Sequence, residues 1–367
     1  MTIPFLDLKA ANQSVRDEVD AAIARVLDSG WLIGGPEVER FEHMFAAYCE
    51  AEHCIGVGNG LDALHLLLRA AGIGPGDEVI VASNTFIATW LAVDMVGATP
   101  VPVEANSATH NLDPTLVEQA ITSRTRAVLV THLYGQPADL DPLLDLCRHH
   151  GLKLFEDAAQ AHGARYKGRV LGGHSDGVAW SFYPSKNLGA LGDGGAVTCN
   201  DAQLASRIRA LGNYGSERRY VNIERGVNSR LDPIHAAAMA VKLPLLDAWN
   251  GHRRAIAALY MDGMANSAVT LPHVPDWAEP VWHLFVIRTK DRERLQAHLA
   301  SRGIQTLIHY PIPPHRQQAY ADSPAAHAPL PIAEQLASEV LSLPIGPQMP
   351  FDHAQAVIAA IRDWSPA

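Results

Sequence analysis

Apolar residues recur along this chain at two spacings, and each spacing predicts a different element. Where they repeat every three or four positions, an amphipathic helix is expected. This pattern covers residues 14–27, 36–49, 61–72, 114–121, 140–150, 251–264 and 291–302. Short apolar runs bounded by turn residues predict buried strands instead. Such runs are found at residues 55–60, 78–83, 99–104, 126–133, 152–157, 177–182, 195–199, 282–289 and 305–310.

The order of these elements predicts the fold class. Strands alternate with helices between residues 55 and 199, which is typical of an α/β protein with a mostly parallel sheet flanked by helices. After residue 245 the pattern changes to mixed helices and strands, separated by proline-rich loops such as YPIPPH. We therefore expect a large domain over residues 15–245 and a smaller C-terminal α/β domain over 246–367, which an N-terminal arm of residues 1–14 joins.

Composition and charge exclude several classes of function. The 367 residues are 48% hydrophobic and 19% charged, which suits a globular protein rather than a disordered chain. A formal net charge of −10 argues against nucleic acid as a partner, because nucleic-acid binders present a basic surface. The longest apolar runs are too short to span a bilayer, so no membrane partner is expected.

The spacing of cysteine and histidine bears on compartment and metal binding. The four cysteines form no CxxC pair, and they predict reduced thiols in the cytoplasm. The first twenty residues lack a basic start followed by an apolar core, so no signal peptide is predicted. The 18 histidines include no HExxH pair, and no metal site is expected.

Two predicted strands lead to side chains that can perform chemistry. Asp157 ends the run KLFED, and Lys186 follows GVAWSF in the loop YPSKNLGALGDGG. Ligands of open α/β sheets bind at the carboxyl ends of the strands. A loop lysine is usually a solvated surface residue, but this loop is held between two buried runs. Asp157 has the alternative of capping a following helix, and its neighbour Glu156 would face the opposite side of a strand.

These residues match what pyridoxal 5'-phosphate requires of a protein: a lysine for its aldehyde, a carboxylate for its pyridine nitrogen, donors for its phosphate and a wall for its ring. Residues 58–64, GNGLDAL, place a glycine turn before a helix whose N-terminus suits a phosphate dianion. Ser181 offers a hydroxyl to the same group. Phe86 would stack on the ring or belong to the core, and Gln160 would approach the ring or its hydroxyl.

Seven segments spread over nearly the whole chain form a common pattern. They are IPFLDLKAANQ, SGWLIGGPEVERFE, GNGLDAL, EDAAQAHGA, SFYPSKNLGALGDGG, GVNSRLDPIHAA and HYPIPPH. Together they resemble the DegT-type nucleotide-sugar aminotransferases, which are fold type I enzymes dependent on pyridoxal phosphate. The resemblance implies that Lys186 carries the cofactor and moves protons, and that Asp157 pairs with the pyridine nitrogen. It also implies that Ser181 and the backbone at Gly60 and Leu61 hold the phosphate, although many relatives have Thr or Ser at the position of Leu61.

The resemblance also implies partners and substrate contacts. Asn228, in GVNSRLD, looks like the residue that family members extend to the phosphate in the neighbouring subunit, so a homodimer with shared active sites is implied. Tyr183, His309 and Tyr310 are expected to touch the sugar. Arg219 is expected to meet the nucleotide phosphates from the partner subunit. The alternatives are a simple turn residue for Asn228 and a solvated arginine for Arg219.

The loop motif points to one branch of the family. YPSKNLGALGDGG resembles the branch that aminates C3 of a nucleotide-linked 3-keto-6-deoxyhexose, whereas the C4 branch more often has Thr-Thr-Gly-Glu-Gly-Gly after the lysine. The resemblance implies glutamate as donor, a dTDP-linked sugar as acceptor and a 3-amino-3,6-dideoxyhexose as product. A C4 aminotransferase is the nearest alternative. A sugar dehydratase of this fold would have histidine in place of Lys186, and a non-catalytic regulator would have lost Lys186 or Asp157.

Overall fold

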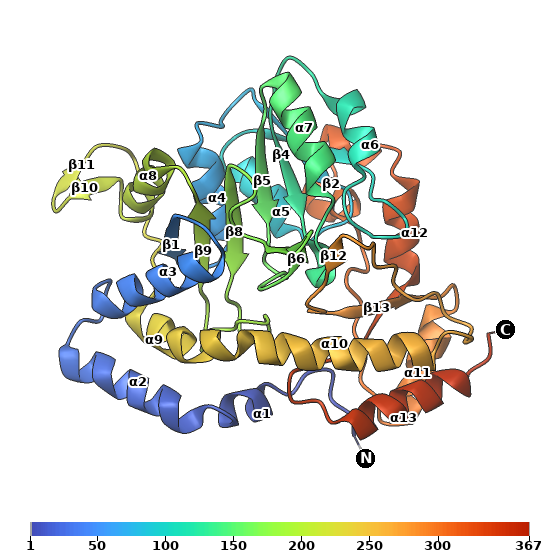
Figure 1. Cartoon of the computed structure of the whole chain (residues 1–367). Helices are drawn as coiled ribbons and strands as arrows, with labels where there is room; N and C mark the ends of the chain where they lie inside the picture. The colour runs from blue at the N-terminus through green and yellow to red at the C-terminus, as the bar shows by residue number, and fades with distance from the viewer. Residues whose placement is uncertain (1, 367) are drawn as a thin grey trace.

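A seven-stranded sheet forms the centre of the computed structural model, which describes residues 2–366 (Figure 1). Its strands lie in the order β1 (His53–Val57), β9 (Gly195–Cys199), β8 (Gly177–Ser181), β5 (Lys153–Asp157), β4 (Thr125–Thr131), β2 (Glu78–Ala82) and β3 (Thr99–Val103). Strand β9 is antiparallel to both of its neighbours, and the other pairs are parallel. The α/β fold with a mostly parallel sheet, predicted from the alternation of elements, is confirmed.

Helices cover both faces of this sheet because its strands are apolar on both sides. Along β2, Val79 and Val81 belong to one core cluster, whereas Ile80 and Ala82 belong to the other. The first cluster includes residues of α4 (Gly60–Ala70), α5 (Ala88–Met95) and α8 (Ala202–Gly212). The second includes residues of α3 (Pro36–Tyr48), α6 (Pro114–Val117), α7 (Leu140–His150) and α9 (Pro233–Lys242).

The C-terminal part of the chain packs around a hydrophobic core of its own, separate from the two clusters that flank the sheet. It contains α10 (Leu246–Gly263), α11 (Arg292–Ser301), α12 (Pro331–Glu339), α13 (Phe351–Arg362) and the antiparallel pair of β13 (Phe285–Arg288) and β14 (Val340–Leu343). The N-terminal arm contributes to it, since Ile3 lies in this core and forms a parallel bridge with Ile304. The division between residues 245 and 246 stays a prediction.

Seven further α-helices and strands are found among residues 2–366. They are α1 (Leu8–Gln13), α2 (Arg16–Ser29), β6 (Arg165–Tyr166), β7 (Arg169–Val170), β10 (Ser216–Arg218), β11 (Val221–Asn222) and β12 (Ala278–Glu279). Figure 1 shows the β10–β11 hairpin projecting from the left side of the molecule, and α10 crossing below the sheet. Among the described helices, none has the length and apolar character needed to cross a membrane.

The strand predicted over residues 305–310 was wrong. In the structure this segment makes one isolated bridge, between Leu307 and Ser342. Prolines at 311, 313 and 314 follow it, and proline has no N–H for a strand ladder. The strand predicted from residue 282 begins only at Phe285, because Trp282 has a φ of 47°, which is incompatible with extended backbone.

Candidate active site

Lys186 and Asp157 line one cavity of about 540 Å³ at the carboxyl ends of the central strands. Asp157 is the last residue of β5, and Lys186 lies in the loop that follows the neighbouring strand β8. The loop folds back tightly: a Cβ added at Gly189 would lie 2.3 Å from the carbonyl oxygen of Pro184. Glycine is therefore required there, and the fold-back presents Lys186 to the cavity.

Burial in the cavity shifts the pKa of both Asp157 and Lys186. Burial raises the pKa of Asp157, while a hydrogen bond from the Thr89 hydroxyl at 2.8 Å and the positive charge of Lys186 act in the opposite direction. Burial lowers the pKa of Lys186 to about 8, although the charge of Asp157 opposes that shift. Lys186 is thus an amine that loses its proton more readily than a surface lysine, beside a carboxylate fixed by Thr89.

Glu156, the sequence neighbour of Asp157, points to the other face of the sheet as predicted. Its carboxylate is fully buried and accepts a hydrogen bond at 2.7 Å from Nε2 of His132, whose Nδ1 accepts from the backbone N–H of Ala138. That hydrogen bond holds the pKa of Glu156 low against the opposite effect of its burial. Only Asp157 of the acidic pair can reach a ligand in the cavity.

The N-terminus of α4 closes one end of the cavity. The side chain of Asn59 caps the helix by accepting from the backbone N–H of Asp62 at 2.9 Å, and the first turn contains Gly60 and Leu61. A Cβ added at Gly60 would lie 2.6 Å from Cβ of Ser181. The helix end and the Ser181 hydroxyl therefore meet in a cradle that only glycine permits, and backbone donors of this kind suit a phosphate group.

Aromatic and amide side chains also line the cavity. Phe86 lines the cavity with 49% of its surface exposed, so it is not the core residue that was its alternative. Its ring centroid lies 5.4 Å from that of Tyr310. Gln160 accepts from the backbone N–H of Tyr134 at 2.6 Å and donates to the hydroxyl of Tyr310 at 3.1 Å. The Gln160 amide is thus oriented by its own neighbours.

The three residues expected to touch a sugar all line this cavity. Tyr183 is exposed, and His309 and Tyr310 come from the segment between β13 and β14. Burial lowers the pKa of His309 to about 4, and its Nδ1 lies 2.8 Å from the hydroxyl of Ser342. Burial also raises the pKa of Tyr310. Both groups are therefore neutral hydrogen-bonding partners near pH 7.

Two predicted site residues lie outside the cavity of their own chain. Asn228 forms an antiparallel bridge with Asn213. Arg219 lies between β10 and β11 with its guanidinium carbon 5.0 Å from the ring centroid of Tyr220. Neither lines the cavity that holds Lys186, and their roles stay predictions.

Sequence reasoning missed several residues of the site, and two of them matter for its chemistry. Thr89, in the first turn of α5, supports Asp157 directly. His283 lines the cavity from the segment before β13 and is buried. A single polar residue inside the apolar run WHLFVI was the available signal for His283, whereas nothing in the sequence connects Thr89 to a carboxylate 68 positions away.

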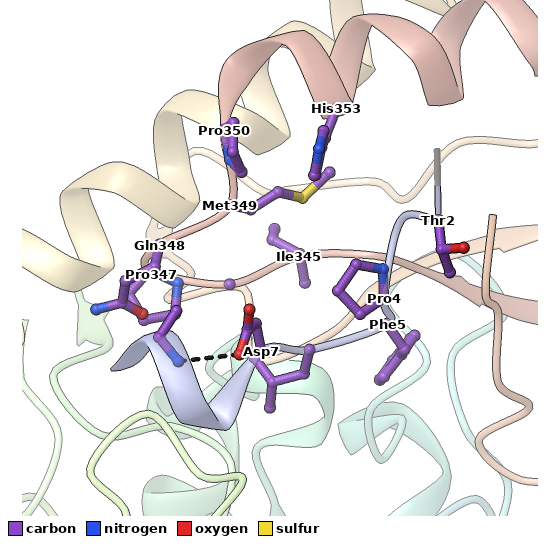
Figure 2. Close-up of a pocket in the computed structure, with 13 residues that line it drawn as sticks. Thr2, Pro4, Phe5, Asp7, Ile345, Pro347, Gln348, Met349, Pro350 and His353 are labelled. Atoms are coloured by element: carbon purple, nitrogen blue, oxygen red, sulfur yellow. Dashed lines mark hydrogen bonds between the residues drawn. The ribbon is translucent and has the colours of Figure 1, made fainter. Parts of the chain in front are cut away.

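A second cavity, of about 460 Å³, lies between the N-terminal arm and residues 345–350 (Figure 2). It shares no lining residue with the first. The carboxylate of Asp7, labelled in Figure 2, caps α1 by accepting from the backbone N–H of Ala10 at 2.9 Å. The lysine and carboxylate expected from the sequence are in the first cavity.

Comparison with known proteins covers almost the whole chain. The model of the DegT/DnrJ/EryC1/StrS aminotransferase family matches residues 13–362. The chain is 56% identical over 364 residues to the dTDP-3-amino-3,4,6-trideoxy-alpha-D-glucose transaminase of Streptomyces venezuelae, covering 99% of this chain and 96% of the relative. It is 53% identical over 362 residues to the dTDP-3-amino-3,6-dideoxy-alpha-D-galactopyranose transaminase of Aneurinibacillus thermoaerophilus, covering 99% of each.

A solved structure agrees with these matches. The crystal structure of S. venezuelae DesV in complex with a ketimine intermediate has a TM-score of 0.98 and 56% identity, covering 99% of this chain and 98% of that one. Aminotransferases of the family use pyridoxal phosphate, and solved structures of similar chains hold it or its amine form. The lysine, the carboxylate and the glycine cradle of the cavity fit that cofactor. The chain is therefore a pyridoxal phosphate-dependent enzyme and belongs to the DegT/DnrJ/EryC1/StrS aminotransferase family.

Proposed function

We propose that this enzyme transfers an amino group from glutamate to C3 of a dTDP-linked 3-keto-6-deoxyhexose and releases a 3-amino-3,6-dideoxyhexose. The observation that carries the proposal is the single cavity in which Lys186, Asp157 and the N-terminus of α4 meet. The choice of C3 is supported by the two relatives above, which are both named as transaminases of 3-amino sugars. A C4 aminotransferase is not favoured.

Within the site, each residue has a separate task. Pyridoxal phosphate, when bound, carries the amino group and withdraws electrons from the reacting carbon. Asp157, fixed by Thr89, places a negative charge where a protonated pyridine nitrogen needs one. Ser181 and the backbone at Gly60 and Leu61 hold the phosphate, and Phe86 and Gln160 confine the ring.

Lys186 moves the proton. Because burial lowers its pKa to about 8, a fraction of its amine is unprotonated near neutral pH and can accept a proton from the reacting carbon. The ammonium so formed returns that proton to the carbon on the other side of the transferred nitrogen, which completes a 1,3-proton shift. The neighbouring Asp157 stabilises the ammonium form by its charge, which keeps the two protonation states of Lys186 close in free energy.

We further propose a homodimer in which the partner completes each site. Asn228 and Arg219 do not line the cavity of their own chain, so their expected contacts with phosphates require a second subunit. The hairpin that carries Arg219 exposes Tyr220, Val221 and Ile223, an apolar surface suited to burial against a partner. The four buried free cysteines fit our placement of the enzyme in the cytoplasm.

The substrate is tested by offering dTDP-linked 3-keto and 4-keto 6-deoxyhexoses separately, each with glutamate. We expect an amine at C3, located by NMR of the product, and little product from the 4-keto sugar. The Lys186→Ala variant is the control for background chemistry, and it should form no product. An amine at C4 would refute the regiochemistry while leaving the aminotransferase assignment unchanged.

A further inference from the structure

His283 is a buried histidine beside Lys186 to which the mechanism above gives no task. It is 8% exposed and lines the same cavity as Lys186. Burial lowers the pKa of His283 well below its usual range, and the positive charges of Lys186 and Arg253 act in the same direction. The ring is therefore neutral near pH 7, with one donor and one acceptor nitrogen, and its role depends on which nitrogen carries the hydrogen.

Asn187 determines which ring nitrogen of His283 carries the hydrogen. Its Nδ2 donates to the carbonyl oxygen of Val281 at 3.0 Å, and because a carbonyl can only accept, the nitrogen end of the amide must lie there. The Oδ1 of Asn187 consequently faces Nδ1 of His283 at 3.2 Å. Since Oδ1 can only accept, Nδ1 must carry the hydrogen. Nε2 of His283 is left with its lone pair.

The orientation of Asn187 is itself anchored in α10. Asn250, which is fully buried, accepts from Nδ2 of Asn187 at 2.8 Å. Its own Nδ2 donates to the carbonyl oxygen of His162 at 2.8 Å, so that amide is also oriented by a group that can only accept. Two buried amides in series thus hold His283 in one tautomer, and the one that contacts His283, Asn187, follows Lys186 directly in the chain.

Nε2 of His283 has no hydrogen-bond partner among residues 2–366, although the ring lines the cavity. The ring is 8% exposed and lines the cavity, so water can reach Nε2 there. A substrate that displaces this water must supply a hydrogen-bond donor, because an acceptor left unpaired costs free energy. A carboxylate cannot be that donor, but a sugar hydroxyl can. Since His283 and Lys186 line the same cavity, a hydroxyl that reaches Nε2 lies close to the carbon on which Lys186 acts.

We propose that Nε2 of His283 accepts a hydrogen bond from a sugar hydroxyl on a carbon adjacent to the reacting carbonyl, and so selects the keto sugar. The inference rests on the proposed C3 reaction, for which the adjacent hydroxyls are those at C2 and C4. His283 is then a specificity-determining residue that acts in the sugar half of the reaction and has no task in the glutamate half.

The first experiment determines the tautomer of His283 and needs no substrate. In cofactor-free, full-length protein with ¹⁵N-labelled histidine, NMR should show Nε2 of His283 unprotonated and Nδ1 protonated, with His283→Gln identifying the signal. The Asn187→Ala variant should give a mixture of tautomers. A protonated Nε2 in the wild type would refute the proposal, and this result does not depend on the proposed substrate being correct.

Kinetics then identify the hydroxyl. His283→Leu should lower kcat/KM for the 3-keto sugar about tenfold, the size of one neutral hydrogen bond, and leave the glutamate half-reaction and cofactor affinity unchanged. His283→Gln, whose Oε1 can accept, should recover part of the loss. With either the 2-deoxy or the 4-deoxy analogue the penalty of His283→Leu should disappear, which names the hydroxyl. An equal penalty on both analogues, or one on the glutamate half-reaction, would overturn the inference.

Discussion

At the scale of single residues, the protonation of Lys186 controls capture of the cofactor. Only an unprotonated amine attacks an aldehyde, and burial lowers the pKa of Lys186 to about 8. The rate at which cofactor-free protein takes up pyridoxal phosphate should therefore rise with pH through about 8 and level off above it. Absorbance of the yellow product measures this rate at each pH.

Borohydride reduction followed by peptide mapping should place the label on the peptide that contains Lys186. The exposed Lys9 lies elsewhere on the chain, and Lys9→Ala serves as the matched control, which should leave the label and its pH dependence unchanged. A label on another peptide, or a rate that rises only near the ordinary lysine pKa of 10.5, would contradict the assignment.

Glu156 and Asp157, the acidic pair at the end of β5, allow a test of which carboxylate serves the cavity. Asp157→Asn removes the charge that faces the cavity, and we expect kcat to fall about a hundredfold, as for other preorganised charges in active sites. Glu156→Gln, on the opposite face, removes the charge bound to His132 instead. It should cost about 1–3 kcal/mol of stability and leave turnover close to that of the wild type.

Thermal unfolding and steady-state kinetics on the same two variants separate these effects. Loss of activity in Glu156→Gln with an unchanged melting temperature would be inconsistent with the geometry of the strand. Full activity in Asp157→Asn would instead contradict the role given to the charge of Asp157.

The residues of the site differ in how far sequence predicts them. Lys186 and Asp157 could be predicted because each follows an apolar run whose end must lie at the edge of the sheet. The task of His283 could not, since it depends on an amide 96 positions away and on a third residue in α10. Hydrogen-bond networks between distant segments leave no periodic pattern in a sequence.

At the scale of elements, the contact between α4 and β8 sets the size of the phosphate cradle. Ala at position 60 would favour the helix by about 0.5–1 kcal/mol, but its Cβ would lie 2.6 Å from Cβ of Ser181. We expect Gly60→Ala to separate the two elements and to weaken cofactor affinity about tenfold or more.

The matched control is Gly251→Ala in α10, where the nearest atom to a new Cβ is Nη2 of Arg254 at 4.0 Å. That variant should gain about 0.5–1 kcal/mol of stability and bind the cofactor normally. Fluorescence titration of cofactor-free protein measures both affinities. If Gly60→Ala bound pyridoxal phosphate as tightly as Gly251→Ala, the cradle would have no role in phosphate binding.

The bounds of helices and strands were predicted best where nearby residues alone determine them. The helix over 140–150 was predicted with the bounds it has, because its apolar stripe ends at Gly151, which adopts a φ of 66°. The segment 305–310 was mistaken for a strand because an apolar run does not reveal whether a neighbouring strand is available to pair with it. In the structure, it carries His309 and Tyr310 to the cavity instead.

At the scale of the whole molecule, the sharing of sites between subunits can be tested by complementation. If a site combines Lys186 of one subunit with Asn228 of the other, a dimer of Lys186→Ala and Asn228→Ala chains contains one site with both residues intact. The two parent proteins should be inactive or weakly active. After unfolding and refolding them together at equal amounts, about a quarter of all sites should be intact by random pairing.

A site built from one chain cannot regain activity on mixing, because a chain lacking Lys186 and a chain lacking Asn228 would each remain defective in any mixture.

The control pairs Lys186→Ala with Asp157→Ala, whose two defects fall in the same half of the shared site. The heterodimer of that pair has no intact site, and its mixture should remain inactive. Steady-state transamination after refolding measures both mixtures. If the two mixtures had equal activity, Asn228 would serve either the cavity of its own chain or no cavity. The proposal that the partner subunit contributes to phosphate binding would then be wrong.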